Sequence, residues 1–252
     1  FKDSPGQVMI IGFTKHVFHK ELLRHPEFGF ISRNEMEDHK KLKRLAETGT
    51  QTDKDALTDF EMKIKKRLSN KQIGGFFKFF GYKEFFNRLF IFSEEAPLDK
   101  SKLGEKDIYR GVKEGWVKLN YDLVRSAANS LIICDEIHNV YNSLDINNYG
   151  IALQMILNLY DSPDEVQKII PVEQDILPTL RNSNIKAVFM SATPINNSPT
   201  EVVDLLNLLI PLSRLPNRKR LKKADLFTDH RNLNKGSREK IADLVRGYVS
   251  FF

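Results

Sequence analysis

The sequence predicts an α/β fold in which a parallel sheet is flanked by helices. Short apolar runs bounded by glycine or polar residues recur along the chain, as buried strands of such sheets do. Stretches with helical apolar spacing separate these runs, and strands that alternate with helices form parallel sheets. The length of 252 residues and the 41% hydrophobic content suit one large domain, or a core domain with an insertion.

The N-terminal third begins with a buried strand and continues as helix. Residues 8–13 are an apolar run closed by Gly12, and a polar helix is expected from His16 to about Arg24, where Pro26 stops it. Residues 34–70 are rich in charge, with apolar residues at helical intervals and a turn-like stretch near Gly49. Two amphipathic helices are therefore expected there.

Eight of the 18 phenylalanines lie in residues 76–92. One interpretation is a strand or helix packed into the core, because aromatic side chains bury large areas. The other is a docking surface for a partner or for nucleic-acid bases, which stack on aromatic rings. Lys78, Lys83 and Arg88 lie among the rings and keep the second interpretation open.

The later elements follow the same patterns. Strands are expected at residues 117–121, 131–134 and 187–190, helices at 122–129 and 151–160, and a helix or loop at 174–180. A strongly apolar helix begins at Pro199 and stops at Pro211.

Charge and cysteine content narrow the class of protein. The net charge is +6, and residues 211–246 hold eleven Lys or Arg against four Asp or Glu, so the remaining residues sum to −1. This segment is either a positively charged surface that binds phosphate backbones or a solvated surface stretch. The single Cys134 excludes an internal disulfide and fits a reducing compartment, and no apolar run reaches the length of a membrane helix.

Two carboxylates follow one predicted strand directly. Asp135 and Glu136 come after residues 131–134, and ligands of open α/β sheets bind beyond the carboxyl ends of the strands. One acid of such a pair can hold Mg²⁺ together with substrate phosphates, and the other can activate the attacking water. The alternative is a strand that simply ends in surface acids.

A second predicted strand ends in small hydroxyl residues. Ser191 and Thr193 follow residues 187–190, and Pro194 comes next. Short hydroxyl side chains at a strand end can hydrogen-bond a neighbouring carboxylate or histidine. They are also common in turns and helix caps.

Taken together, residues 135–138 (D-E-x-H) and 191–193 (S-A-T) resemble motifs II and III of superfamily 2 helicases. Residues 8–15 resemble motif Ia of that family, and residues 119–122 stand where motif Ib is expected. The resemblance is closest to NTPases of large DNA viruses, such as poxvirus-type nucleoside triphosphatase I and the early transcription factor small subunit. It implies a RecA-like motor lobe 1 over residues 1–29 and 115–252, with residues 30–114 as a mainly helical insertion of unknown role.

The resemblance also implies roles for single residues. Asp135 would coordinate the Mg²⁺ of ATP, and Glu136 would position the hydrolytic water. His138, Ser191 and Thr193 would couple the nucleotide state to lobe movement. The nucleic-acid contacts would come from Thr14 and Lys15.

The chain departs from the family in one respect, because it contains no G-x-x-x-x-G-K-[ST] phosphate loop. This loop precedes motif Ia in the family, and the chain begins at Phe1. We therefore expect a lobe that is incomplete at its N-terminus, and a fragment that on its own neither binds ATP tightly nor hydrolyses it.

The expected function is a nucleic-acid-dependent ATPase of helicase or translocase type. DNA is expected as its partner in preference to RNA, and no membrane association is expected. In a large DNA virus it would serve transcription, beside a viral RNA polymerase or transcription factor subunit, in the virion and the cytoplasmic viral factory. If the protein is not viral, an intracellular soluble location is expected. The alternative is a non-catalytic lobe that serves as a docking scaffold. An unrelated Mg²⁺ nuclease is disfavoured, because it would need further acids at positions that can bind the metal ion.

Overall fold

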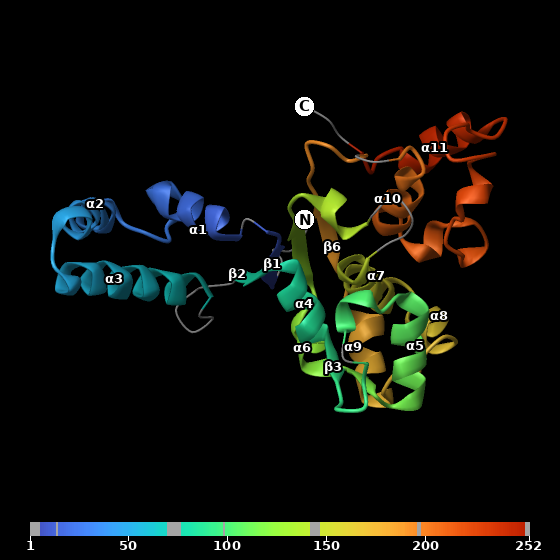
Figure 1. The fold of residues 1–252 in the computed structure, drawn as a ribbon, viewed down its shortest axis with the longest axis horizontal. Helices are drawn as coiled ribbons and strands as arrows, with labels where there is room; N and C mark the ends of the chain where they lie inside the picture. Colours follow the sequence, from blue (N-terminus) through green and yellow to red (C-terminus); the bar gives the residue numbers. More distant parts are fainter. Residues whose placement is uncertain are drawn as a thin grey trace.

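The computed structural model describes residues 6–13, 15–69, 77–97, 99–141, 147–195 and 198–249. A four-stranded parallel sheet forms the centre, helices pack against it, and three helices extend away from one side (Figure 1). The predicted α/β class is confirmed, and the architecture is consistent with a RecA-like lobe.

The sheet has the strand order β2-β1-β5-β6, and all three pairings are parallel. The strands are β1 (Gln7–Ile11), β2 (Phe77–Phe80), β5 (Ser130–Cys134) and β6 (Lys186–Phe189). Strand β1 is buried along its whole length, as its continuous apolar run predicts for a strand that is covered on both faces. Strand β6 alternates between exposed and half-buried residues.

The four strands end at the same level. In the pairing register, Ile11 lies opposite Phe80 on one side and Cys134 on the other, and Cys134 lies opposite Phe189. The next residue of three strands continues the ladder, since the amides of Gly12, Asp135 and Met190 donate to the neighbouring strand ends at 2.9–3.0 Å. The residues that follow the strands therefore meet along one edge of the sheet.

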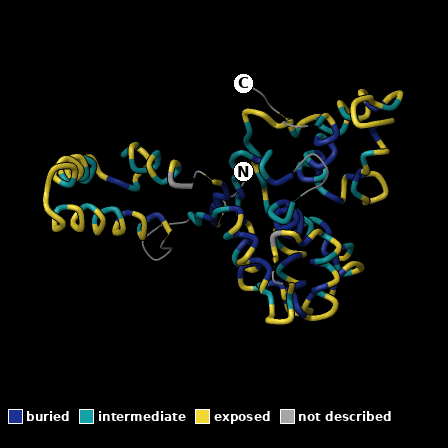
Figure 2. The backbone as a smooth tube through the Cα atoms, viewed as in Figure 1, coloured by how far each residue is buried: buried dark blue, intermediate teal, exposed yellow. Residues whose placement is uncertain are grey.

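Six helices build the core around the sheet, and the buried residues concentrate there (Figure 2). Helix α7 is buried nearly all round and packs against α4, which a helix that is apolar on every side requires. The six are α4 (Tyr82–Leu89), α5 (Glu105–Glu114), α6 (Tyr121–Ser126), α7 (Asn148–Asp161), α8 (Pro163–Gln167) and α9 (Leu177–Asn182). Short 3-10 helices at Lys100–Lys102, Ile137–Val140 (η4) and Gln174–Ile176 join them.

Most of the phenylalanine-rich stretch belongs to this core. Phe80, Phe85, Phe86 and Phe90 are each at most 5% exposed, so the interpretation as a surface for stacking bases is wrong for these rings. These four rings pack in the core because their burial removes a large apolar area from water.

The strand expected near residue 117 is present, but it lies outside the parallel sheet. β4 (Val117–Leu119) pairs antiparallel with β3 (Phe90–Phe92) in a separate two-stranded sheet. Gly115, in the left-handed region at φ +89°, ends α5 and turns the chain into β4.

Residues 15–69 form a helical arm that extends from the β2 side of the sheet (Figure 1). It contains α1 (Lys15–Arg24), a 3-10 turn at Pro26–Phe28, α2 (Arg33–Thr48) and α3 (Gln51–Ser69). Ser32 caps α2 through a reciprocal pair of hydrogen bonds with Glu35, and α2 buries none of its residues. The two amphipathic helices expected in residues 34–70 correspond to α2 and α3.

The range expected to be an insertion, residues 30–114, is not structurally uniform. Its first part, α2 and α3, lies in the arm, whereas residues 77–80 are an edge strand of the central sheet. Residues of α4, β3 and α5 belong to the main apolar core. We propose that the insertion is confined to the arm.

The C-terminal part packs on a second apolar cluster. α10 (Glu201–Leu209) bridges the two clusters, because Leu208 lies in the main core and Leu206 in the second. The basic segment 211–246, which includes α11 (Ser237–Val245), folds over the second cluster, and several of its cations are paired. Arg220 pairs with Glu105, and Arg218 lies 3.8 Å from Glu165, so the segment is not a uniformly free basic stripe.

An ion pair between α2 and α3 stabilises the arm, and its effect depends on pH. Arg67 donates to both carboxylate oxygens of Glu35, at 2.8 and 3.1 Å, and this contact is the main reason that the pKa of Glu35 is lowered from 4.5 to about 2. A carboxyl whose pKa is lowered by folding stabilises the fold above its unfolded pKa, and the contribution disappears as the pH falls towards the folded pKa.

We therefore expect Glu35→Gln to lower the free energy of unfolding at pH 7 by about 1–2 kcal/mol. Glutamine keeps the capping geometry of α2 but removes the charge that Arg67 binds. Urea denaturation of parent and variant at pH 7 and near pH 2 measures the effect. The difference should shrink at the lower pH, and an equal difference at both would contradict the assignment.

Candidate functional site

The acid pair stands at the middle of the carboxyl edge of the sheet. The Asp135 amide donates to the carbonyl oxygen of Ile11 at 3.0 Å, and the Asp135 carbonyl oxygen accepts the Tyr82 hydroxyl at 2.6 Å. Gly12 packs directly against this residue, because a Cβ at position 12 would lie 3.1 Å from the Cβ of Asp135. The backbone of Asp135 is therefore held by the end of β1 and by Tyr82 at the start of α4.

Glu136 adopts a conformation that is unusual for a residue with a side chain. Its φ of +53° and ψ of +52° lie in the left-handed region, which costs about 1–2 kcal/mol outside glycine. Strained backbone of this kind clusters at functional sites, where the surrounding structure enforces it. Here Asn139 anchors the turn, since its side-chain amide and its backbone amide both donate to the Glu136 carbonyl oxygen.

The side chains of the two strand ends meet. Nδ1 of His138 lies 2.8 Å from Oγ of Ser191 and 3.2 Å from Oε2 of Glu136. The Thr193 amide donates to the same Ser191 hydroxyl at 3.1 Å. The Ile137 amide, just after the acid pair, donates to the Met190 carbonyl oxygen at 3.0 Å. Residues 136–138 and 190–193 are thus in contact at the carboxyl edge of the sheet, and we call this meeting of the two strand ends, with Asp135, the crevice.

One oxygen of this cluster is not satisfied by hydrogen bonds within the part of the chain that the structure describes. Oε2 of Glu136 is buried and makes no such bond, and Nδ1 of His138 lies 3.2 Å from it. A buried carboxylate oxygen without a hydrogen bond costs free energy, so this oxygen calls for a functional explanation.

Two tyrosines support the crevice, and nothing in the sequence pattern marks them. Tyr82 is 1% exposed, and burial is the main reason that its pKa lies well above 10, with smaller effects from the nearby Cys134, Asp135 and Glu136. It stays protonated and donates to Asp135. The Tyr141 hydroxyl donates to the carbonyl oxygen of Pro194 and so ties the end of η4 to the loop after β6.

Not every predicted site residue can be placed. Thr14 and the side chain of Lys15 lie outside the described residues, and only the backbone of Lys15, at the start of α1, is described. Thr193 is exposed at the rim of the crevice. The roles of these residues remain predictions.

A metal could be held at this edge only with help from a ligand. Among the described residues, no group of three or more His, Cys, Asp or Glu side chains has the arrangement of a metal site. Mg²⁺ bound with a nucleotide takes one or two carboxylates, several waters and the phosphate oxygens. The Asp135 and Glu136 pair fits that donor set and does not fit a cage built by the protein alone.

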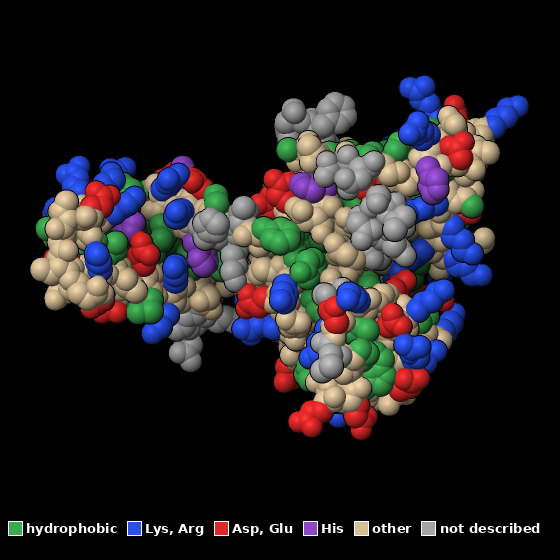
Figure 3. All heavy atoms as spheres, in the orientation of Figure 1, with side chains coloured by type: hydrophobic (Ala, Val, Ile, Leu, Met, Phe, Trp, Pro, Cys, Tyr) green, Lys and Arg blue, Asp and Glu red, His purple; other side chains and the backbone are tan. Residues whose placement is uncertain are grey.

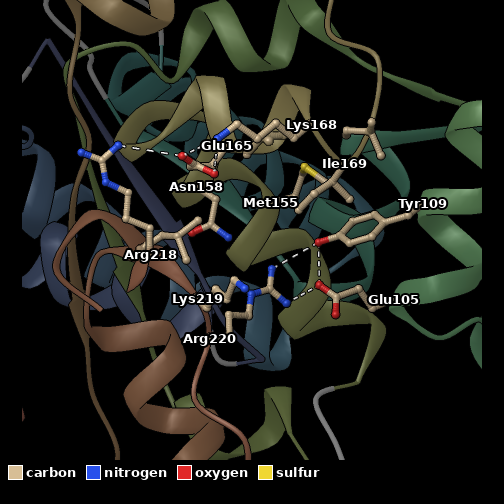
Figure 4. Close-up of a pocket in the computed structure, with 13 residues that line it drawn as sticks. Glu105, Tyr109, Met155, Asn158, Glu165, Lys168, Ile169, Arg218, Lys219 and Arg220 are labelled. Carbon is tan, nitrogen blue, oxygen red and sulfur yellow. Dashed lines mark hydrogen bonds and ion pairs between the residues drawn. The ribbon is translucent and has the colours of Figure 1, made fainter. Parts of the chain in front are cut away.

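A cavity of about 330 Å³ lies elsewhere, between the C-terminal segment and helices α5, α7 and α8 (Figure 4). Arg220 donates to Glu105 and to the Tyr109 hydroxyl, and Glu165 binds Lys168 at 2.9 Å. None of the crevice residues lines it. Its two glutamates pair with three of its four cations, Lys168, Arg218 and Arg220, and we interpret the cavity as a contact region between the two apolar clusters.

The fold and the crevice define this chain as an α/β protein with a parallel sheet of RecA-like type. The chain is similar over all of its length to the early transcription factor large subunit homolog of African swine fever virus. Proteins of that name from a Kenyan and a Malawian isolate are each 34% identical over 278 aligned residues, which cover 100% of this chain and 23% and 24% of the relatives.

A further relative is the protein named "Putative ATP-dependent RNA helicase" of Acanthamoeba polyphaga mimivirus. It is 27% identical over 196 residues, which cover 75% of this chain and 14% of the relative. The chain spans about a quarter or less of the length of these relatives. The African swine fever virus relatives carry the name of the large subunit, whereas the motif resemblance pointed to the small one.

No family model and no solved structure matches the chain significantly. Among the described residues, no helix has both the length and the apolar character that crossing a membrane requires.

Proposed function

We propose that this chain is the first motor lobe of a nucleic-acid-dependent ATPase of helicase superfamily 2 that acts in viral transcription. The observation that carries the proposal is the shared crevice, where Glu136 and Ser191 both lie within 3.2 Å of the His138 ring nitrogen. The names of the relatives, an early transcription factor subunit and an RNA helicase, support the same class.

In this proposal Asp135 holds the Mg²⁺ of ATP, directly or through water. The metal ion would supply charge neutralisation on the phosphates when it is bound. Tyr82, Gly12 and the Ile11 carbonyl oxygen keep the Asp135 backbone in place. The Asp135 side chain is therefore attached to a backbone position that is fixed at the strand end. Such positioning matters because phosphoryl transfer depends mainly on geometry and electrostatics.

Glu136 is the proposed general base. Its left-handed backbone turns the side chain away from the line of the strand, and its buried Oε2 lacks a hydrogen bond within the described residues. A carboxylate oxygen in that state can accept a proton from a water molecule beside it. His138, 3.2 Å away, orients the same oxygen.

His138, Ser191 and Thr193 form the proposed coupling path. A change in the position of Glu136 on nucleotide binding or hydrolysis would move the His138 ring, and the Ser191 hydroxyl would transmit that movement to the loop after β6. This loop is also tied to η4 through Tyr141, so both strand ends would shift together. Thr14 and Lys15 are proposed to touch nucleic-acid phosphates at the start of the arm.

The wider setting is part of the same proposal. DNA is the proposed nucleic acid, ATP and Mg²⁺ the cofactors, and a viral RNA polymerase or transcription factor subunit the protein partner. The virion and the cytoplasmic viral factory are the proposed locations.

The experiment is ATP hydrolysis with and without DNA or RNA, in a polypeptide that carries this lobe together with the phosphate loop and second lobe of the superfamily. Ser191→Ala removes the hydroxyl that contacts His138 and leaves both acids intact. We expect basal hydrolysis to persist, while stimulation by nucleic acid falls several-fold.

Two outcomes would count against the proposal. If the parent polypeptide hydrolyses no ATP under any condition, the lobe is a docking scaffold. If Ser191→Ala is stimulated as strongly as the parent, the coupling path is wrong.

A further inference from the structure

Two adjoining grooves run along the helical arm. The first, of about 710 Å³, lies between α1, α2 and α3, and the second, of about 580 Å³, lies between α1, α3, β2 and α4. His19 and Lys65 line both, so the grooves are continuous. Their cationic side chains are Lys20 and Arg24 of α1, Lys40 and Lys43 of α2, Lys65 and Lys66 of α3, Lys78 of β2 and Arg88 of α4.

Five of these cations have no acidic partner among the described residues. They are Lys20, Lys40, Lys43, Lys65 and Lys66, and all five are exposed. The acids that line the grooves are engaged instead: Glu61 lies 3.1 Å from His39, and Glu84 lies 3.3 Å from Arg88. The grooves therefore keep a net positive charge that the protein does not neutralise.

The lysines converge from three helices. Lys40 and Lys43 are three residues apart on α2 and lie on the same face, which α2 turns towards the groove. Lys65 comes from α3 and Lys20 from α1, on the other sides of that groove. The visible face of the arm carries Lys and Arg side chains along its length, with His side chains between them (Figure 3). Lysines gathered along a concave path match a chain of phosphates better than a single anion.

The aromatic side chains of the grooves are already occupied. His39 stacks on Phe60 at 5.8 Å, and His19 packs edge-on against Phe79 at 3.7 Å. Proteins that hold single strands offer open aromatic faces to the bases, and none of these four rings is exposed. The groove chemistry therefore favours a duplex, whose bases are stacked internally and whose phosphates face outwards.

We propose that the grooves of the helical arm bind the phosphate backbone of duplex DNA. The inference rests on the proposed nucleic-acid-dependent function and assigns its principal DNA-binding surface to the arm and the adjoining residues of β2 and α4. α1 begins three residues after Gly12, which packs on Asp135, so the arm is joined to the crevice by a very short connection. DNA held on the arm would bias the position of that connection.

The test measures binding of the 252-residue chain, without nucleotide, to a fluorescent 20-base-pair duplex of mixed sequence by anisotropy. The variant is Lys43→Glu combined with Lys65→Glu. The matched control is Lys41→Glu combined with Lys63→Glu, which makes the same charge change on exposed lysines of the same two helices that do not line the grooves. Circular dichroism confirms that both variants keep the helix content of the parent.

We expect the groove variant to bind the duplex about tenfold or more weakly than the control. The slope of log affinity against log salt concentration should also be shallower by about 2, because each lysine contact contributes about 0.9 to this slope. Equal affinities of groove variant and control would overturn the inference, and so would the absence of binding to any nucleic acid. Tighter binding to single-stranded DNA or RNA of the same length would overturn the duplex assignment. Each of these failures leaves the proposed ATPase chemistry standing, because that chemistry is tested by hydrolysis and not by binding.

Discussion

Glu136→Gln is expected to lower ATP hydrolysis by about 100-fold or more, in a polypeptide that contains this lobe with the phosphate loop and second lobe of the superfamily. A general base contributes about 10²–10⁴-fold to a rate, and glutamine fills the same space without accepting the proton. The contact of Oε2 with His138 at 3.2 Å and its buried position make position 136 sensitive to this change. Steady-state phosphate release at saturating ATP measures the effect.

The control for this prediction is Glu95→Gln, which makes the same chemical change at an exposed glutamate far along the chain from the crevice residues. It should hydrolyse ATP at the rate of the parent. Nucleotide binding should survive in Glu136→Gln, because the proposed Mg²⁺ ligand Asp135 is untouched. If Glu136→Gln is as active as the parent, Glu136 has no part in the mechanism.

Phe86→Ala is expected to destabilise the 252-residue chain by about 3–5 kcal/mol. The Phe86 ring is 2% exposed, and its centroid lies 5.3 Å from that of Phe90 and 5.8 Å from that of Phe92. Truncation leaves a cavity between α4 and the small β3-β4 sheet, and the rigid neighbours fill it only in part. The free energy of unfolding from urea denaturation measures the loss.

Phe28→Ala is the matched control, because the same atoms are removed from a ring that is 54% exposed in the arm. We expect a change within about 0.5 kcal/mol. If the two variants lose equal stability, Phe86 is not part of the main core. The phenylalanine-rich stretch would then be interpreted as a docking surface.

Local sequence patterns predicted most of the elements. The apolar runs before Gly12, Asp135 and Met190 are β1, β5 and β6, and the helical spacing in residues 34–70 gives α2 and α3. The parallel pairing of β5 with β6 also followed, since a helical crossover separates them. Because the carboxyl ends of parallel neighbours lie together, that pairing brings the end of β5, with its acid pair, beside the end of β6, with Ser191.

Other features depend on contacts between residues far apart in the sequence. The phenylalanine-rich β2 joins the central sheet only because it pairs with β1, whose residues lie about 70 positions earlier. Tyr82 reaches the Asp135 carbonyl oxygen across 53 positions, and Arg220 reaches Glu105 across 115. No spacing or motif marks such partners.

The sequence by itself thus determined the class of fold, the strands that carry the candidate chemistry and the residue types at their ends. Short-range spacing is sufficient for these, because strand and helix periods and strand-end positions are properties of a few consecutive residues. Only the tertiary structure decided the left-handed turn at Glu136, the extent of the arm and the neutralisation of part of the basic segment. These depend on which distant surfaces pack together, and packing energy is shared among many weak contacts that no local pattern encodes.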